Sequence, residues 1–147
     1  MATYSVLMIE TPTFLHFVKR ASLHIKYGVD IVGVVDNSKD ALELIRSKQP
    51  EVLLVDIREA SLNGLKILAD IRSDYPQILA IGRVRNPDYK FILGAIAAGV
   101  IGFINDRAVY PELVRAIQAV RQGYPFLPQN IEYSFVLGLQ QDCAGTD

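Results

Sequence analysis

Val52-Leu-Leu-Val-Asp56 is a run of four apolar residues that ends on a carboxylate. Unbroken apolarity, in place of an alternating pattern, is typical of a strand that is covered on both faces, as in a parallel sheet. Open α/β sheets place their chemistry at the carboxyl ends of such strands. Asp56 is therefore the first candidate functional residue of this chain.

Similar runs recur along the chain and alternate with segments of helical periodicity. The predicted strands are Ser5–Glu10, Ile31–Val35, Glu51–Asp56, Ile78–Ile81 and Ile101–Ile104. Apolar stripes at helical spacing lie in Phe14–Ile25, Ala41–Ile45, Leu65–Ile71, Phe91–Ala98 and Leu113–Val120. Five βα units predict an α/β fold: a five-stranded parallel sheet, doubly wound, with helices on both faces.

The length of 147 residues suits one domain with a core of its own. After Gln122 the pattern changes to Gly123-Tyr-Pro-Phe-Leu-Pro128, which is typical of a linker. Residues 130–140 can form a short helix, and the last seven residues have the composition of a disordered tail. We expect a domain over residues 1–122 and a short C-terminal extension over residues 123–147.

Net charge and cysteine content limit the classes of function that this chain can have. Fifteen Lys and Arg against sixteen Asp and Glu give a net charge of −1, so no basic field indicates a nucleic-acid surface. The single Cys143 allows no internal disulfide, which favours a reducing compartment. The longest apolar stretch, residues 91–104, is broken by glycines and is shorter than the ~20 residues of a membrane-spanning helix. We expect a cytoplasmic protein without membrane contact.

Over residues 4–122 the chain resembles the receiver domains of bacterial two-component response regulators, especially those of helix-turn-helix regulators of the nitrate-regulator type. The resemblance rests on the five-fold βα order, on Asp56 followed by Gly64, and on Ala97-Ala-Gly99-Val-Ile-Gly102-Phe103 entering the fifth strand. The stretch Val114–Leu127 also resembles the fifth helix and exit segment of that subfamily. The resemblance implies a flavodoxin-like receiver fold in which Asp56 holds the phosphoacceptor position.

The resemblance also implies a Mg²⁺ site, which this sequence fills only in part. In the family an acidic pair after the first strand holds the ion, and here that pair reads Glu10-Thr11. A hydroxyl in place of a carboxylate removes one charge from a site that binds a hard cation through oxygen. The remaining ligands would be Glu10, Asp56 and the backbone carbonyl of Arg58.

Two further groups of the resembled pocket are replaced. The hydroxyl that follows the phosphoryl group in the family is Gly82 here, and the lysine that pairs with its oxygens is Asp106. An acid at the position of that cation reverses the local charge. The aromatic position that swings inward on activation is retained as Phe103. The pattern resembles an atypical receiver, or pseudo-receiver.

The leading hypothesis is a pseudo-receiver that regulates transcription through protein–protein contacts, largely independently of aspartyl phosphorylation. One alternative is a phosphorylatable receiver that uses Asp56 and a degenerate Mg²⁺ site, and Mg²⁺ is then the only cofactor. Alternatively, Asp56 pairs with Arg83 or Arg107 and is simply a structural carboxylate. An enzyme with its own substrate is not expected, because no Cys–His or Ser–His arrangement lies near the strand ends.

A third hypothesis is a sensor of a small anionic ligand. Its site would be a rim of arginines predicted in the loops above the strand ends, namely Arg58, Arg83, Arg85 and Arg107. The competing interpretation pairs these arginines with neighbouring acids, among them Glu10, Asp56 and Asp106. No glycine-rich phosphate loop supports the sensor.

The expected partners are proteins, including a second copy of the chain. Either the fourth helix, fifth strand and fifth helix or the first and fifth helices would form the dimer surface, as in the resembled family. Leu15, Phe17 and Leu23 lie off the main stripe of the first helix and are predicted to form an exposed apolar patch. DNA would be contacted only through a helix-turn-helix domain beyond Asp147.

Overall fold

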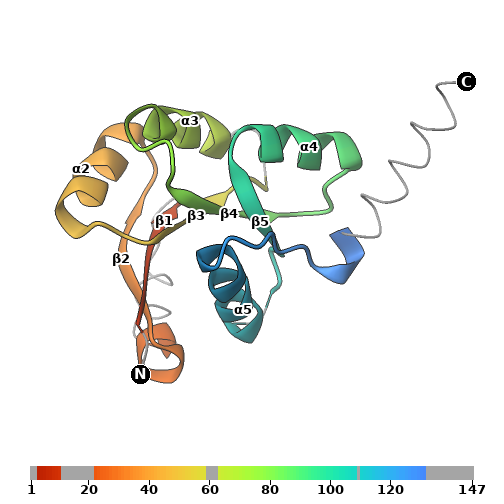
Figure 1. Cartoon of the computed structure of the whole chain (residues 1–147), viewed down its shortest axis with the longest axis horizontal. Helices are drawn as coiled ribbons and strands as arrows, with labels where there is room; N and C mark the ends of the chain where they lie inside the picture. The colour runs from red at the N-terminus through yellow and green to blue at the C-terminus, as the bar shows by residue number, and fades with distance from the viewer. Residues whose placement is uncertain (1–2, 11–21, 59–62, 109, 132–147) are drawn as a thin grey trace, which may run out of the picture.

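The computed structural model describes residues 3–10, 22–58, 63–108 and 110–131 and shows a five-stranded sheet (Figure 1). The strands are β1 (Tyr4–Ile9), β2 (Val29–Val35), β3 (Val52–Asp56), β4 (Leu79–Val84) and β5 (Val100–Asn105). All four neighbouring pairs are parallel, in the order β2-β1-β3-β4-β5. This order confirms the predicted doubly wound, flavodoxin-like receiver fold.

Helices cover both faces of the sheet. They are α2 (Ser38–Lys48), α3 (Gly64–Asp74), α4 (Tyr89–Ala97) and α5 (Tyr110–Arg121). One apolar cluster joins the sheet to α2, α3 and α4, and a second joins it to α5 and to the helical residues 22–27 (Figure 1). Every residue of β3 is buried as a result, in keeping with its unbroken apolar sequence.

The first predicted helix falls mostly outside the described residues, and with it Leu15 and Phe17. Its last turn is described, and there the predicted faces are wrong. Leu23 is only 3% exposed and packs in the cluster of α5, whereas Ile25, expected in the core, is 76% exposed. The inward face of residues 22–27 therefore differs from the face predicted by the apolar stripe of residues 14–25. Leu23, and not Ile25, points into the core.

β4 is longer than its apolar run predicted. The expected strand ended at Ile81, but pairing with β3 continues to Arg83 and pairing with β5 continues to Val84. Arg83 therefore lies inside a strand, opposite Asp56 of β3, and not in a loop above it. Backbone pairing can extend past the apolar residues here because the carboxyl edge of the sheet allows polar side chains to reach solvent.

The predicted linker begins as an addition to the sheet. α5 ends in a turn at Gly123, which has φ +88°, and the chain then returns along β5, where Phe126 bridges Gly102 in parallel (Figure 1). Residues 129–131 are helical, while the rest of the predicted helix over residues 130–140 lies outside the described residues. In the described part of the chain, no helix has the length and apolarity that crossing a bilayer requires.

A pair of glycines tests the packing around α4. Gly99 has φ +110°, and a Cβ there would lie 2.5 to 2.7 Å from atoms of the Arg72 side chain, whereas a Cβ at Gly94 meets nothing within 4 Å. We expect Gly99→Ala to lower the free energy of unfolding by about 1–3 kcal/mol. Gly94→Ala should raise it by about 0.5–1 kcal/mol, because alanine loses less entropy in a helix. Urea denaturation measures both, and equal effects of the two variants would contradict this packing.

Candidate functional site

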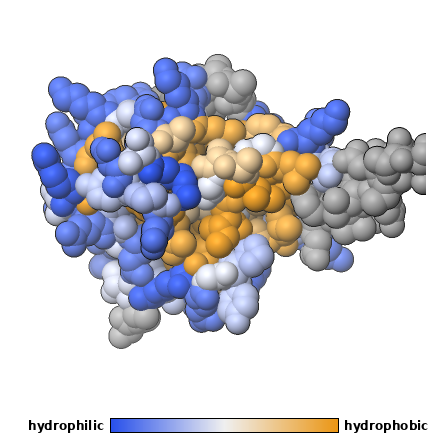
Figure 2. All heavy atoms as spheres, turned by 45° about the horizontal axis from the view of Figure 1, so that its top comes forward, coloured by the Kyte–Doolittle hydropathy of each residue, from blue (hydrophilic) through white to orange (hydrophobic). Residues whose placement is uncertain are grey.

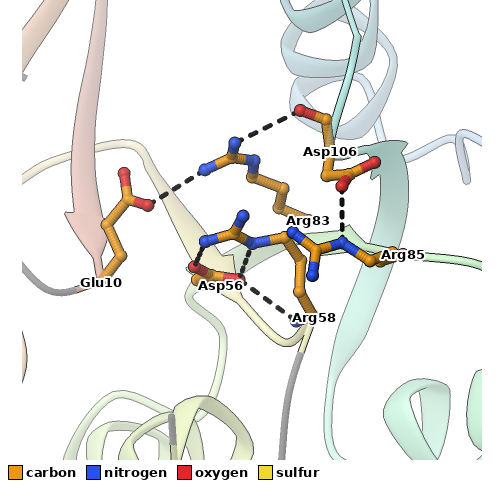
Figure 3. A network of polar contacts seen from close by, with 6 residues as sticks. All are labelled: Glu10, Asp56, Arg58, Arg83, Arg85 and Asp106. Carbon is orange, nitrogen blue, oxygen red and sulfur yellow. Dashed lines mark hydrogen bonds and ion pairs between the residues drawn. The ribbon is translucent and has the colours of Figure 1, made fainter. Parts of the chain in front are cut away.

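The carboxyl ends of four strands bring a set of acids and arginines to one edge of the sheet (Figure 3). Glu10 directly follows β1, Asp56 closes β3, and Asp106 directly follows β5. The arginines come from β4 and from the residues just after β3 and β4. Gly64 begins α3 directly against this edge, since a Cβ there would collide with the carbonyl oxygen of Asp56. Six of the predicted candidates thus gather in space, namely Glu10, Asp56, Arg58, Arg83, Arg85 and Asp106. Thr11 lies outside the described residues.

Asp56 forms a bidentate ion pair with Arg58. Nε of Arg58 donates to Oδ1 at 2.9 Å and Nη2 donates to Oδ2 at 2.7 Å. The backbone N–H of Arg58 also donates to Oδ1, at 3.1 Å. The Asp56 side chain is only 3% exposed, so both of its oxygens are held by one neighbour away from bulk water. One alternative paired Asp56 with Arg83 or Arg107, but the partner is Arg58, which the competing interpretation of the arginine rim had included.

The ion pair shifts both pKa values toward the charged forms. Burial raises the pKa of Asp56, but the hydrogen bonds and charge of Arg58, with a smaller contribution from Arg83, outweigh it and bring the pKa below the usual 3.8. The hydrogen bonds that Arg58 donates to Asp56 raise the pKa of Arg58 in turn. Asp56 is therefore an ionised carboxylate whose charge is already neutralised inside the protein.

Arg83 spans the site from β1 to β5. Its Nη1 donates to Oε2 of Glu10 at 3.1 Å, and its Nη2 donates to the backbone carbonyl of Asp106 at 3.2 Å. Its place in β4, opposite Asp56 on β3 and Ile104 on β5, gives the side chain this reach. The Glu10 carboxylate is buried, so Arg83 supplies a charged partner for a second acid of the edge.

Asp106 pairs with the third arginine. Nε of Arg85 donates to its Oδ2 at 2.8 Å. This hydrogen bond, with the charges of Arg85 and other nearby arginines, lowers the pKa of Asp106 below its usual 3.8 against the opposing effect of burial. Arg107 is exposed. Three of the four arginines proposed for an anion-binding rim are therefore bound to acids of the same edge.

The space beside Gly82 is filled by an apolar side chain. A Cβ on Gly82 would lie 2.6 Å from Cδ1 of Ile57 and 3.2 Å from Cγ1 of Val100. Ile57 is itself buried within the core cluster of the α2–α4 side. Ile57 was not among the predicted site residues, because an isoleucine after a strand gives no signal of the position it fills. A side chain bearing a hydroxyl could enter here only if Ile57 moved.

Phe103 is already fully inside the domain. Its side chain is 1% exposed and belongs to the apolar cluster of the α2–α4 side. Its backbone N–H donates to the carbonyl oxygen of Phe126 at 2.8 Å, in the segment that follows α5. The aromatic position of the family switch is therefore occupied in a buried arrangement and is bonded to the exit of the domain.

The residues of the edge do not fit a Mg²⁺ ion in this arrangement. Mg²⁺ needs oxygen ligands in near-octahedral geometry, preferably carboxylates with oxygens directed at the ion. Here both oxygens of Asp56 accept from Arg58, and Glu10 accepts from Arg83. Over the described ranges, no three His, Cys, Asp or Glu side chains gather as a metal site would require. Within the described part of the edge, one or both oxygens of each acid accept from an arginine, so a cation would compete with three internal ion pairs.

The amino-acid sequence matches known regulators. BvgA of Bordetella pertussis, named as a transcription regulator of virulence factors, is 28% identical over 123 residues, which are 84% of this chain and 58% of BvgA. The DNA-binding transcriptional activator EvgA of Escherichia coli is 25% identical over 122 residues, covering 82% of this chain and 59% of EvgA. The chain thus spans little more than half the length of these relatives.

The fold matches solved structures of the same class. A LuxR-family two-component response regulator from Aurantimonas sp. SI85-9A1 superposes with a TM-score of 0.80 at 19% identity, over 93% of this chain and 98% of that one. The family described as the response regulator receiver domain matches residues 6–118. Together with the sheet order and Asp56 at the end of β3, this match establishes that the chain belongs to the family of response regulator receiver domains.

Proposed function

We propose that this receiver domain regulates transcription through protein–protein contacts, largely independently of aspartyl phosphorylation. The observation that carries the proposal is the ion pair in which Arg58 binds both carboxylate oxygens of the buried Asp56. The domain would have no reaction of its own, and its output would depend on the surfaces it presents to partners.

Phosphoryl transfer needs a carboxylate oxygen that can attack in line and cations that neutralise the transferred group. An Asp56 oxygen could attack only after its hydrogen bonds to Arg58 were broken. Charge-assisted bidentate bonds are the strongest class of hydrogen bond in proteins, so this step is costly. The ion pair therefore opposes phosphorylation, because its hydrogen bonds must break before an Asp56 oxygen can attack.

The rest of the edge offers little help to a phosphoryl group. Asp106 places a carboxylate where the family has a cation, and Ile57 fills the space beside Gly82 where the family has a hydroxyl. A phosphorylated Asp56 would then lack the lysine and the hydroxyl through which the resembled receivers respond. These two replacements support the proposal independently of Arg58.

The two alternatives have less support. A phosphorylatable receiver would need Mg²⁺ at Glu10 and Asp56, whose oxygens accept from Arg83 and Arg58. An anion sensor would need free guanidinium groups, but Arg58, Arg83 and Arg85 are bound to acids. The charges of these three arginines are thus already paired with acids of the same chain, so an anionic ligand would have to displace those acids.

We further propose that the domain is a cytoplasmic part of a longer regulator and forms a homodimer. BvgA and EvgA are longer than the matched region and carry names of transcription regulators, and EvgA is named as DNA-binding. The net charge of −1 gives this chain no basic surface for DNA, so a further domain would make that contact. The receiver-like unit would then act on the DNA-binding unit through the segment from Gly123 onward.

Incubation with acetyl phosphate and Mg²⁺ tests the proposal directly. We expect intact-protein mass spectrometry to show no stoichiometric species heavier by about 80 Da, the mass of one phosphoryl group. The Asp56→Asn variant is the matched control for labelling elsewhere on the chain. Stoichiometric labelling of the wild type that disappears in Asp56→Asn would overturn the proposal.

The ion pair should make stability depend on pH. Because the pKa of Asp56 is lowered in the folded state, its contribution is complete above the unfolded pKa of about 3.9 and is lost as the pH falls through the folded pKa. Arg58→Ala should cost about 2–3 kcal/mol of unfolding free energy at neutral pH, since it leaves a buried carboxylate without its cation. The cost should shrink near pH ~3, where Asp56 of the variant is protonated.

Urea denaturation of wild type and variant at both pH values measures this difference. Arg115→Ala, which removes an exposed arginine of α5, is the control for a general loss of charge. A cost of Arg58→Ala that is equal at both pH values would contradict the role assigned to the pair.

A further inference from the structure

Residues 124–131, which we term the exit strap, run back along the free edge of β5 (Figure 1). The reversal is made by the end of α5: the N–H of Gly123 donates to Val120 at 3.0 Å, and the N–H of Tyr124 donates to Ala119 at 2.9 Å. These two hydrogen bonds, with Gly123 in a left-handed backbone conformation, form a turn that is typical of helix C-termini. The strap therefore travels from the start of β5 toward its carboxyl end.

Two neighbouring side chains of the strap, Phe126 and Leu127, pack with different apolar clusters of the domain. Phe126 packs with the cluster of α5, and Leu127 packs with the cluster on the α2–α4 side. Ile131 is 1% exposed and belongs to the latter cluster. The strap thus covers an edge strand that would otherwise present unpaired backbone groups.

The backbone attachment of the strap is short. The N–H of Phe103 donates to the carbonyl of Phe126 at 2.8 Å, and the N–H of Phe126 donates to Ile101 at 3.4 Å. Pro125 and Pro128 flank this bridge and have no N–H, so they cannot donate to a longer ladder. Segments held by few backbone bonds are those that open locally while the rest of a fold stays intact.

Packing beneath the strap is incomplete as well. A groove of about 260 Å³ lies between α4, β5 and the strap, and its lining includes Ile96, Phe103, Pro125 and Leu127. α4 exposes Leu93 and Ile96, and Figure 2 shows apolar side chains gathered on this side of the molecule. Pro125 and Leu127 of the strap therefore rest on one edge of an open apolar groove, whereas Ile131 at its far end is buried in the core cluster.

The far end of the strap is fastened beside the candidate site. Asn105 and Asn130 exchange side-chain hydrogen bonds, at 3.0 and 3.4 Å. Asn105 is the last residue of β5 and directly precedes Asp106, which binds Arg85 through its carboxylate and Arg83 through its carbonyl. Consecutive residues thus join the exit of the domain to the ion pairs of the edge.

We infer that the exit strap is a latch: it opens from β5 without unfolding of the sheet, and the ion pairs around Asp106 bias this opening through Asn105. When the strap is fastened, Asn130 near its end is held beside Asn105, at the carboxyl end of β5. When the strap opens, its attachment to β5 and to Asn105 is lost. Phe103, whose N–H holds the strap, is itself buried.

Hydrogen–deuterium exchange at the Phe103 amide, measured by NMR on the full chain, tests the latch because this N–H is bonded to the strap. Asn105→Ala and Asn130→Ala should each accelerate its exchange about fivefold, the effect of losing one net side-chain hydrogen bond. Amides of β3 should keep their wild-type rates. Gln129→Ala, an exposed neighbour within the strap, is the matched control and should change nothing.

A separate variant, Arg85→Ala, tests the coupling between the strap and the ion pairs of the site. Arg85→Ala breaks the ion pair with Asp106 and should accelerate exchange at Phe103 at least about twofold, with β3 again unchanged. Wild-type exchange at Phe103 in both asparagine variants, or equal acceleration throughout the sheet, would overturn the latch. Acceleration in the asparagine variants but not in Arg85→Ala would overturn its coupling to the site.

Discussion

The bidentate ion pair between Asp56 and Arg58 determines what the edge of this sheet can do. A carboxylate that is 3% exposed must be paired, because an isolated buried charge costs several kcal/mol. Arg58 supplies that partner from two residues away, through two side-chain nitrogens and one backbone N–H. The position that the receiver family uses for chemistry is thereby stabilised as a structural contact.

The neighbouring groups follow the same logic of internal neutralisation. Arg83 binds the buried Glu10, Arg85 binds Asp106, and Ile57 fills the space beside Gly82. An ordinary receiver pocket keeps charge available for an incoming ion and phosphoryl group, whereas here the charges are matched to one another. A receiver fold whose edge charges are matched internally is the basis for the proposal that the domain acts through its surfaces and its exit segment.

The sequence indicated the fold well but the contacts of the site only in part. Unbroken apolar runs such as Val52–Val55 are a strong signal, because few other structures bury every residue of a segment. The end of β4 was misplaced because polar residues at the open edge, such as Arg83, hide a strand that backbone pairing extends. The partners of the side chains were harder to predict from the sequence. Several arginines lie near Asp56 in the predicted fold, and the backbone turn after β3 brings Arg58 to it. The return of Phe126 to β5 was missed because two prolines indicated a linker.

An NMR titration of the wild-type chain with Mg²⁺ and beryllofluoride, a mimic of the phosphoryl group, tests the central claim most directly. The Nε–H of Arg58 reports on its bond to Asp56, and the amides after β3 and β5 report on the site. A closed ion pair predicts no saturable shift of these signals at millimolar concentrations. A saturable shift that depends on both reagents and is absent in Asp56→Asn would contradict the account, because it would show a pocket that still opens to receive a phosphoryl group.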